Sequence, residues 1–270
     1  MTQQQAYQSP TERVQAWADG STLHIRFNNP GRHNALSVDM WQAIPPLLLQ
    51  AEQDPAIRLV VFSGAGDKAF VSGADISQFE DMRAAREAVK KYEHMAENAL
   101  MGLYRFSKPV VAAIQGYCIG GGLNMAISCD IRIASSDSVF AIPATRLGLG
   151  YRFSALKNLV DLVGPGAAQD IFYTGRRLDA EEAKSIGLVN RIAPREEFDE
   201  LLAEYVTAIT TGAPLTIKAG KQIIREVLKA DDNIDAELCK RLITECFESE
   251  DYAEGRRAFM EKRKPVFKGK

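Results

Sequence analysis

The sequence predicts an α/β fold with largely parallel strands and a helical layer added at its C-terminal end. Over the first two thirds of the 270 residues, short apolar runs typical of buried strands alternate with segments whose apolar residues recur at helical spacing. From Arg195 onward the pattern is helical, with one clear break at residues 212–214. We see no repeat or linker that divides the sequence. We therefore expect one continuous domain, with a core over residues 1–194 and a helical region over residues 195–270.

Composition excludes several classes of function. The 33 Lys and Arg residues nearly balance the 35 Asp and Glu residues, so a formal net charge of -2 gives no electrostatic reason to expect binding to nucleic acid or to a membrane surface. The polar start MTQQQAYQSP lacks the features of a signal peptide, and no apolar run reaches membrane-spanning length, which predicts a cytoplasmic protein. The four cysteines form no CxxC pair and the three histidines are scattered, so we expect no metal site.

The expected strands and helices follow from apolar runs, turn residues and helical spacing. Strands are expected over residues 14–18 and 22–28, joined as a hairpin at Asp19-Gly20, and over residues 58–63, 109–114, 130–134, 139–142 and 187–192. One or two long helices are expected over residues 77–106, and single helices over residues 38–53, 123–128, 155–163 and 178–185. Another helix should follow the separator at residues 164–166 and end near Thr174, and most of the chain beyond residue 195 should be helical. Pro45-Pro46 should break or kink the first helix, and residues 144–154 should form an irregular loop.

Two glycine-containing turns are the candidates for a functional site. The turn SGAD at residues 72–75 and the turn GGG at residues 120–122 each follow an apolar strand and precede a helix. Free backbone N–H groups at such turns can bind negative charge, so together the two turns can form an oxyanion hole. Such a hole stabilises a thioester enolate, and losing one donor typically costs about 100- to 1000-fold in rate. The alternative is that each is a tight turn packed against a neighbouring element.

Five segments follow one another over nearly the whole sequence in the order NNPGRHNALS, AFVSGADI, IQGYCIGGGLNMAISCDIRIAS, TGRRLDAEEAKSIGLVNRI and EGRRAFMEKRKPVF. Together they closely resemble the crotonase (enoyl-CoA hydratase/isomerase) superfamily. The resemblance implies a crotonase-like spiral of ββα units with a C-terminal helical layer. It also implies acyl-CoA thioester substrates, with coenzyme A entering as part of the substrate and no separate cofactor. The implied assembly is a homo-oligomer, a trimer or a dimer of trimers.

The same resemblance assigns roles to individual residues. It makes the backbone N–H groups of Ala74 and Gly121 the oxyanion hole. Phe259 and Lys262 match positions that contact the acyl group and the CoA phosphates, often from a neighbouring subunit. The positions implied to bind CoA are Arg32, Ser72, Gly73, Asp75, Ile76, Phe259 and Lys262. The alternatives are that Asp75 caps a helix and that Lys262 lies on a solvated helix face.

Two positions depart from the hydratases of this superfamily. The resemblance aligns their two water-activating glutamates with Asn124 and Ala144. Neither an amide nor a methyl group can take a proton from water at neutral pH. Both acid/base groups of the usual hydration mechanism are therefore missing from their expected positions.

The loop GLGYRFSALKNL at residues 148–159 offers replacements. It resembles the methylmalonyl-CoA decarboxylase branch of the superfamily, which implies that Tyr151 stands at the active-site tyrosine position. A tyrosine can donate a hydrogen bond to a carboxylate or polarise a bound water, and Arg152 or Arg146 can pair with an acidic substrate group. The alternative is that Tyr151 packs in the loop and that the arginines are solvated or bind a neighbouring subunit.

Three functions are compatible with these residues. The resemblance over the whole sequence favours an enzyme, an enoyl-CoA hydratase-like lyase. The second is a decarboxylase of a malonyl-type CoA thioester, since loss of carbon dioxide gives the enolate without a base. The third is a non-catalytic acyl-CoA-binding protein that has kept the fold and lost the chemistry. Of the remaining carboxylates, Glu80 is a reserve proton carrier, and Asp130 is expected to cap backbone groups.

Overall fold

The computed structural model describes residues 5–75, 82–229 and 233–270. The strands are β1 Gln5–Ala6, β2 Val14–Asp19, β3 Thr22–Phe27, β4 Leu59–Gly64, β5 Ala69–Val71, β6 Val110–Ile114, β7 Tyr117–Ile119, β8 Ile131–Ser135, β9 Val139–Ala141 and β10 Arg191–Ala193. The α-helices are α1 Val38–Gln53, α2 Met82–Arg105, α3 Gly121–Ser128, α4 Ala144–Leu147, α5 Phe153–Thr174, α6 Ala180–Ser185, α7 Phe198–Thr210, α8 Pro214–Val227, α9 Ala236–Glu248 and α10 Glu250–Met260.

The strands form two sheets that the chain visits in turn. The larger sheet has the order β1-β2-β3-β4-β6-β8-β10, and the smaller has the order β5-β7-β9. The hairpin of β2 and β3 is antiparallel, whereas β3, β4, β6, β8 and β10 run parallel, as do β5, β7 and β9. Successive pairs β4/β5, β6/β7 and β8/β9 place one strand in each sheet, and a helix follows each pair. This is the expected spiral of ββα units.

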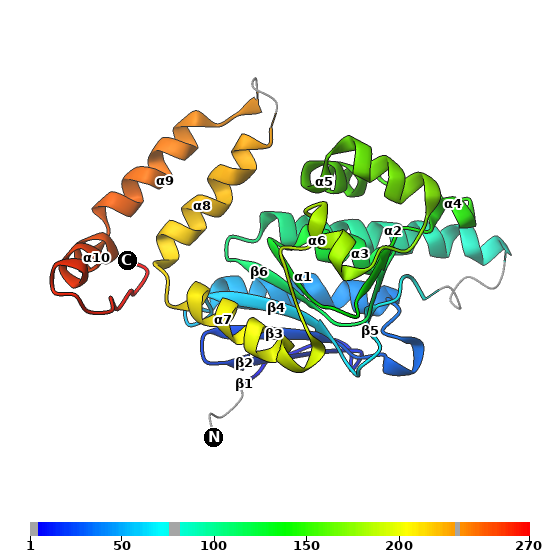
Figure 1. Ribbon diagram of the computed structural model, residues 1–270, viewed down its shortest axis with the longest axis horizontal. Coiled ribbons are helices and arrows are strands. Elements are labelled where there is room, and N and C mark those ends of the chain that lie inside the picture. Colours follow the sequence, from blue (N-terminus) through cyan, green and yellow to red (C-terminus); the bar gives the residue numbers. More distant parts are fainter. Residues whose placement is uncertain (1–4, 76–81, 230–232) are drawn as a thin grey trace.

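The central strands of the larger sheet are buried on both faces, which explains their unbroken apolar sequences. On one face, Val60 and Phe62 of β4 pack into the main core with α1, α2 and α3. On the other face, Val61 of β4 and Val111 of β6 pack against Phe198 of α7. Because side chains alternate along a strand, neighbouring residues of β4 serve different layers. Figure 1 shows α2, α3, α5 and α6 gathered on one side of the molecule, over β5 and β6.

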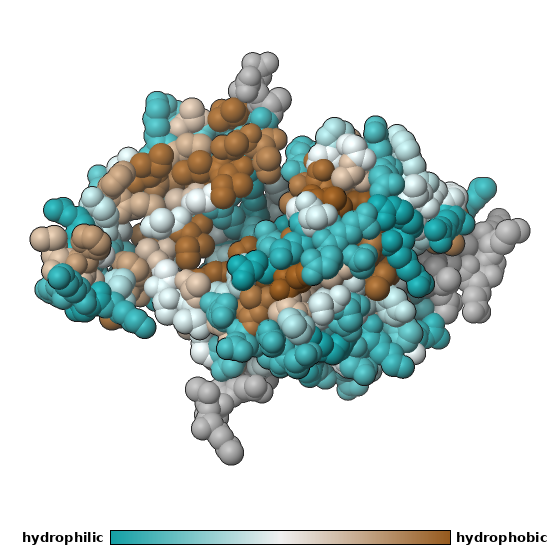
Figure 2. Space-filling view, viewed as in Figure 1, coloured by the Kyte–Doolittle hydropathy of each residue, from teal (hydrophilic) through white to brown (hydrophobic). Residues whose placement is uncertain are grey.

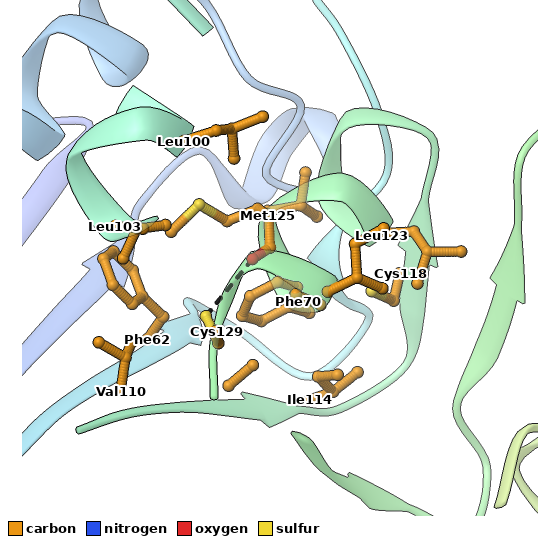
Figure 3. Packing of buried hydrophobic residues seen from close by; sticks show 14 of the residues in the cluster. Phe62, Phe70, Leu100, Leu103, Val110, Ile114, Cys118, Leu123, Met125 and Cys129 are labelled. Carbon is orange, nitrogen blue, oxygen red and sulfur yellow. Dashed lines mark hydrogen bonds between the residues drawn. The ribbon is translucent and has the colours of Figure 1, made fainter. Parts of the chain in front are cut away.

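Helix α3 lies inside the main core, not on the surface. Leu123 and Met125 project from it among side chains of α2, β5 and β6, as Figure 3 shows. Cys129 closes the helix with a hydrogen bond from Sγ to the carbonyl oxygen of Met125 at 3.4 Å. A β-carbon on Gly122 would lie 2.4 Å from the carbonyl oxygen of Val71, so this glycine lets α3 rest directly on β5. The first turn of α3 is thereby fixed against the smaller sheet.

Helices α8, α9 and α10 form a C-terminal arm that projects away from the two sheets (Figure 1). Lys221 of α8 anchors the arm, because its ammonium group contacts Asp130 Oδ2 at 2.7 Å and donates to the carbonyl oxygen of Lys108 at 2.6 Å. Asp130 also accepts the N–H of Val110 at 2.7 Å, which confirms its expected capping role. The ion pair across the arm was not expected from the sequence.

Several elements differ from expectation. Helix α1 runs unbroken through Pro45 and Pro46, because its buried face, including Ile44 and Leu47, is held in the core. The expected loop at residues 144–154 instead contains the short helix α4 and the start of α5. Strand β7 lies where only a turn was expected. In the C-terminal region, α8 ends at Val227 and α9 begins at Ala236, so a second helix boundary follows the expected break at residues 212–214. The expected break between residues 163 and 166 is present, since the backbone of Gly164 is not helical.

Candidate active site

The two glycine turns meet at one edge of the smaller sheet. Strands β5 and β7 pair in parallel, so the turns that follow them leave from the same edge. A β-carbon on Gly120 would lie 3.9 Å from Gly73 Cα, and one on Gly121 would lie 4.0 Å from the carbonyl carbon of Gly73. Positive φ angles at Gly73 (126°) and Gly120 (53°) require glycine there. The predicted juxtaposition of the two turns is therefore present.

The backbone around Ala74 orients its N–H group. Leu36 forms a parallel bridge with Ala74, in which the Leu36 N–H donates to the Gly73 carbonyl and the Asp75 N–H donates to the Leu36 carbonyl, both at 2.8 Å. In such a bridge the residue between the two bonded groups directs its own N–H to the opposite side. The Ala74 N–H therefore points away from Leu36. Gly121 is the first residue of α3, where the N–H groups have no partner within the helix.

Two aromatic side chains that the sequence did not identify lie over Gly121. A β-carbon at Gly121 would stand 3.4 Å from the Tyr92 hydroxyl oxygen and 3.7 Å from Trp41 Cζ2. The two rings pack edge to face with centroids 6.3 Å apart. Both residues lie at helical spacing on apolar faces of α1 and α2, a pattern that predicts core packing and gives no separate signal for a site.

Asn124 lies one turn beyond Gly121 on α3. Its side chain is buried, and its Oδ1 makes no hydrogen bond in the described part of the chain. The backbone carbonyl oxygen of Asn124 accepts a hydrogen bond from the Ser128 hydroxyl at 2.8 Å. Ala144, the other position that departs from the hydratases, is also buried, at the start of α4. These two positions thus present an amide and a methyl group.

The structure brings Tyr151 to Asn124. Burial raises the pKa of the Tyr151 hydroxyl, and the adjacent Asn124 side chain opposes that shift only in part. The hydroxyl is buried and forms no hydrogen bond of good geometry within the described residues. The Tyr151 ring packs edge-on against Phe172 at a centroid distance of 5.3 Å. Tyr151 therefore packs in its loop and also places a protonated hydroxyl beside Asn124.

Arg152 is held by the helix that carries Tyr92. Its Nε lies 3.1 Å from a carboxylate oxygen of Glu93, and its Nη1 lies 3.4 Å from one of Glu97. Nη1 also donates to the Glu93 carbonyl oxygen at 3.1 Å. The positive charge of Arg152 is therefore already balanced by two carboxylates of α2, in contrast to the solvated arginine considered from the sequence.

The first motif and the first glycine turn are joined by several hydrogen bonds. Arg32 Nη1 donates to Asp75 Oδ1 at 2.8 Å. The Ser72 N–H donates to the His33 carbonyl at 3.1 Å, and the Ser72 hydroxyl donates to the Arg32 carbonyl at 3.3 Å. The residues implied to bind CoA at Arg32, Ser72, Gly73 and Asp75 therefore lie together. Ile76 and Glu80 lie outside the described residues.

Asn34 organises this loop and was not identified from the sequence. Its φ of 56° is left-handed, a conformation that asparagine tolerates better than most residues. Its buried side chain accepts the Asn29 N–H at 2.9 Å and donates to the carbonyl oxygens of Ala65 and Ala69 at 2.9 and 2.7 Å. The asparagine after a turn signal is the only clue that the sequence offers for this role.

Phe259 and Lys262 do not join the other predicted residues within one chain. Phe259 lies near the end of α10 with 82% of its surface exposed, and Lys262 follows the helix with a positive φ. Figure 1 places α10 at the end of the molecule opposite α4 and β5. A contact of these residues with the site would therefore have to come from a second copy of the chain.

Over residues 5–75, 82–229 and 233–270, no three His, Cys, Asp or Glu side chains gather as metal ligands would. Within the same ranges, no helix has the length and apolar character needed to cross a membrane.

Known proteins resemble the chain over almost all of its length. The family model described as enoyl-CoA hydratase/isomerase matches residues 18–270. The short-chain-enoyl-CoA hydratase of Clostridium acetobutylicum is 34% identical over 246 residues, covering 91% of this chain and 94% of that protein. The carnitinyl-CoA dehydratase of Salmonella typhi is 30% identical over 271 residues, covering 96% of this chain and 100% of that protein.

Solved structures agree with these matches. A crystal structure of an enoyl-CoA hydratase/carnithine racemase from Magnetospirillum magneticum has a TM-score of 0.91 and 34% identity, covering 97% of each chain. An enoyl-CoA hydratase/isomerase family protein from Hyphomonas neptunium has a TM-score of 0.89 and 36% identity, covering 96% of this chain and 99% of that chain. The sequence and structural matches together establish that this protein belongs to the enoyl-CoA hydratase/isomerase family, within the crotonase superfamily.

Proposed function

We propose that the protein is an acyl-CoA lyase that stabilises a thioester enolate with the backbone N–H groups of Ala74 and Gly121. The observation that carries this proposal is the contact between the two glycine turns at one edge of the smaller sheet. Two backbone donors fixed before the substrate arrives lower the energy of a developing oxyanion without reorganising. The partial positive charge at the start of α3 adds to the effect of the Gly121 N–H.

The first candidate reaction is hydration of an enoyl-CoA, or the reverse elimination. Two relatives in the comparison are named enoyl-CoA hydratase and carnitinyl-CoA dehydratase, and both names describe addition or loss of water. Asn124 and Tyr151 supply a buried amide oxygen and a buried phenol that can hold a water molecule. The positions of the two usual glutamates still lack a base, so this candidate requires the water to be activated by another group.

The second candidate reaction is decarboxylation of a malonyl-type CoA thioester. It is favoured by the neutral character of Asn124 and Tyr151, because the proton on Tyr151 is retained by burial. The neutral side chains of Asn124 and Tyr151 can hydrogen-bond to a substrate carboxylate without the repulsion that a glutamate would cause. Loss of carbon dioxide then leaves its electron pair on the thioester as an enolate, so no base is needed.

The experiment is a turnover assay with a panel of thioesters. Purified protein is incubated with crotonyl-CoA and with malonyl-, methylmalonyl- and ethylmalonyl-CoA, and products are identified by mass spectrometry. Hydration of crotonyl-CoA supports the first candidate, and release of carbon dioxide from any malonyl-type thioester supports the second. Tight acyl-CoA binding with no turnover of any member would reject both and support a non-catalytic binding protein.

We also propose that the protein self-associates into a trimer or a dimer of trimers. The support is the apolar surface of the C-terminal arm, which Figure 2 shows gathered over α8 and α9. Ile224, Val227 and Phe247 of these helices are largely exposed. A hollow of about 710 Å³ lies between α9, α10 and the segments around them, lined mainly by apolar side chains. Apolar surface of this extent is typical of an interface between subunits. Light scattering coupled to size-exclusion chromatography measures the mass, and a monomer at micromolar concentration would reject the assembly.

A further inference from the structure

The helix on the outer face of the larger sheet leaves the β2–β3 hairpin partly open. Under α7, Val61 of β4 packs against Phe198. The strand register pairs His24 with Val61 and Trp17 with His24, so these side chains point to the side of α7. Arg26, two residues beyond His24 on β3, points the same way. Trp17 and Arg26 are only half-buried, so this side of the hairpin is not fully covered.

A cleft of about 280 Å³ lies between this part of the hairpin and the first turn of α7. Trp17 and Arg26 line it from the hairpin, and Phe198, Asp199 and Leu202 line it from α7. Pockets for drug-sized ligands have about 300 to 1,000 Å³, so this cleft has room only for a small molecule. It is separate from the proposed active site, because the two glycine turns follow β5 and β7 of the smaller sheet.

Arg26 is held in place by neutral groups. Its Nε and Nη2 both donate to Gln15 Oε1, at 3.1 and 2.6 Å, and its Cζ lies 4.9 Å from the centre of the Trp17 ring. Within the described residues, Nη1 has no hydrogen-bond partner and the guanidinium forms no ion pair. The contacts therefore fix the group without neutralising its charge.

Asp199 brings the opposite charge to the same cleft. It is exposed in the first turn of α7, where a negative charge is favoured by the helix dipole. In the part of the chain that the structure describes, its carboxylate forms neither a hydrogen bond nor an ion pair, with Arg26 or with any other group. The cleft thus carries one unpaired positive and one unpaired negative side chain, on two different elements.

We propose that this cleft binds a small zwitterion, a molecule with one carboxylate and one ammonium group. The carboxylate accepts hydrogen bonds from the Arg26 guanidinium, whose planar shape suits a carboxylate. The ammonium group donates to Asp199, and the carbon chain contacts Phe198 and Leu202 in the lining from α7. A simple anion fits less well, because it would bring a second negative charge close to Asp199. The inference does not depend on the proposed lyase activity.

The test measures binding of small amino acids to the full-length protein. The probes are the 2-, 3- and 4-amino isomers of butanoate, which differ in the spacing of their charges, together with butanoate and butylamine, which carry one charge each. At least one isomer should bind with a dissociation constant of about 1 mM, a value within reach of so few atoms. It should bind at least tenfold more tightly than butanoate and butylamine. No binding of any isomer, or equal binding of butanoate, overturns the inference.

The readout is the NMR signal of the Trp17 indole N–H. The protein has two tryptophans, and the variant Trp17→Phe identifies the signal by its loss. A bound probe should shift this signal and leave that of the buried Trp41 unchanged. An excess of coenzyme A should not alter the dissociation constant. Displacement of the probe by coenzyme A would place it in the proposed active site and overturn a separate cleft site.

Two variants test the two charges. Arg26→Met keeps the apolar stem over Trp17 and removes the charge, and Asp199→Asn keeps the shape of its side chain. Each should weaken binding of the zwitterion about tenfold, the usual effect of losing one charge-assisted hydrogen bond. Glu200→Gln is the matched control, because it removes the same charge from the first turn of α7 outside the cleft. Unchanged binding in either variant, or an equal loss in Glu200→Gln, would overturn the assignment. Circular dichroism verifies that each variant is folded.

Discussion

Arg32 donates a hydrogen bond to Asp75 across two loops, with its Nη1 2.8 Å from Asp75 Oδ1. The Asp75 side chain is 9% exposed and that of Arg32 is 55% exposed. The ion pair thus joins the first motif to the turn that carries Ala74, and more than half of the Arg32 side chain remains exposed.

Arg32→Ala should raise KM for acyl-CoA about tenfold and leave kcat nearly unchanged. The reason is that the residue is implied to contact the nucleotide part of CoA, which takes no part in the reaction. The measurement is steady-state kinetics with an acyl-CoA and with the matching acyl-pantetheine, which lacks the nucleotide. The KM for acyl-pantetheine should not change. Arg13→Ala, which removes an exposed arginine paired with Asp39, is the control. Equal KM increases for both thioesters would contradict the assignment.

Asn124→Asp should lower decarboxylation more than Asn124→Ala does. An added carboxylate beside the buried Tyr151 hydroxyl would repel the carboxylate of a malonyl-type substrate, whereas a methyl group would remove only a hydrogen bond. We expect at least a tenfold difference between the two variants in kcat/KM for methylmalonyl-CoA. The assay is mass spectrometry of the product. An Asn124→Asp variant as active as Asn124→Ala would argue against binding of a substrate carboxylate beside Asn124 and Tyr151.

Stability should depend on pH through Asp54. Its Oδ2 accepts the Tyr7 hydroxyl at 2.6 Å, and this hydrogen bond lowers the pKa of the carboxyl. A carboxyl with a lower pKa in the folded state contributes stability above its unfolded pKa and loses that contribution as pH falls through the folded value. Tyr7→Phe should therefore lower the free energy of unfolding by about 1 kcal/mol at pH 7, and by less at pH 3.

Urea unfolding at the two pH values measures this difference. Tyr173→Phe, a change at an exposed tyrosine, should have no effect at either pH. A loss for Tyr7→Phe that is the same at pH 7 and pH 3 would show that the carboxylate is not involved.

Asp130→Ala should destabilise the protein strongly. The change leaves the ammonium group of Lys221, whose side chain is 7% exposed, without its carboxylate. Breaking a buried ion pair in this way costs about 3 to 5 kcal/mol, and the partial exposure of Asp130 places the expected loss near the lower value. Lys221→Met in the same background should recover much of the loss, because no buried charge then remains. Chemical denaturation tests both, and a double variant no more stable than Asp130→Ala would refute the explanation.

Phe247→Asp should dissociate the proposed assembly. Phe247 is 60% exposed on α9 and lines the hollow of the C-terminal arm, so a charge there would be buried in an interface between subunits. Leu49→Asp, at an exposed leucine of α1, is the matched control and should keep the mass of the wild type. Light scattering at several concentrations gives the masses. An unchanged mass for Phe247→Asp would place the subunit interface elsewhere.

Local signals predicted the parts of the fold that depend on local chemistry. The β2–β3 hairpin followed from alternation around Asp19-Gly20, and both glycine turns followed from glycines between apolar strands and helices. The prolines of α1 were misleading, because the packing of its buried face outweighs the local cost of Pro45 and Pro46. Helix α4 was missed because four residues give too short a pattern to read.

The candidate site could be predicted only in part, because some of its residues give no distinctive pattern in the sequence. The resemblance brought Asn124 and Tyr151 to one site, and they do lie together. Trp41 and Tyr92 could not be identified, since a buried aromatic at helical spacing looks the same whether it fills a core or borders a ligand. The ion pair of Arg152 with Glu93 joins segments that are distant in sequence, so no local pattern could reveal it.

The absence of a side chain at Gly122 has a consequence for the proposed catalysis. Without it, the backbone of the first turn of α3 lies directly against Val71. If the Gly121 N–H is an oxyanion donor as proposed, an amide held in this way would keep its direction without substrate, so the electrostatic work of aligning it would be completed during folding and not repeated in each catalytic cycle. Any larger residue at this position would separate the helix from the strand and return that cost to every turnover.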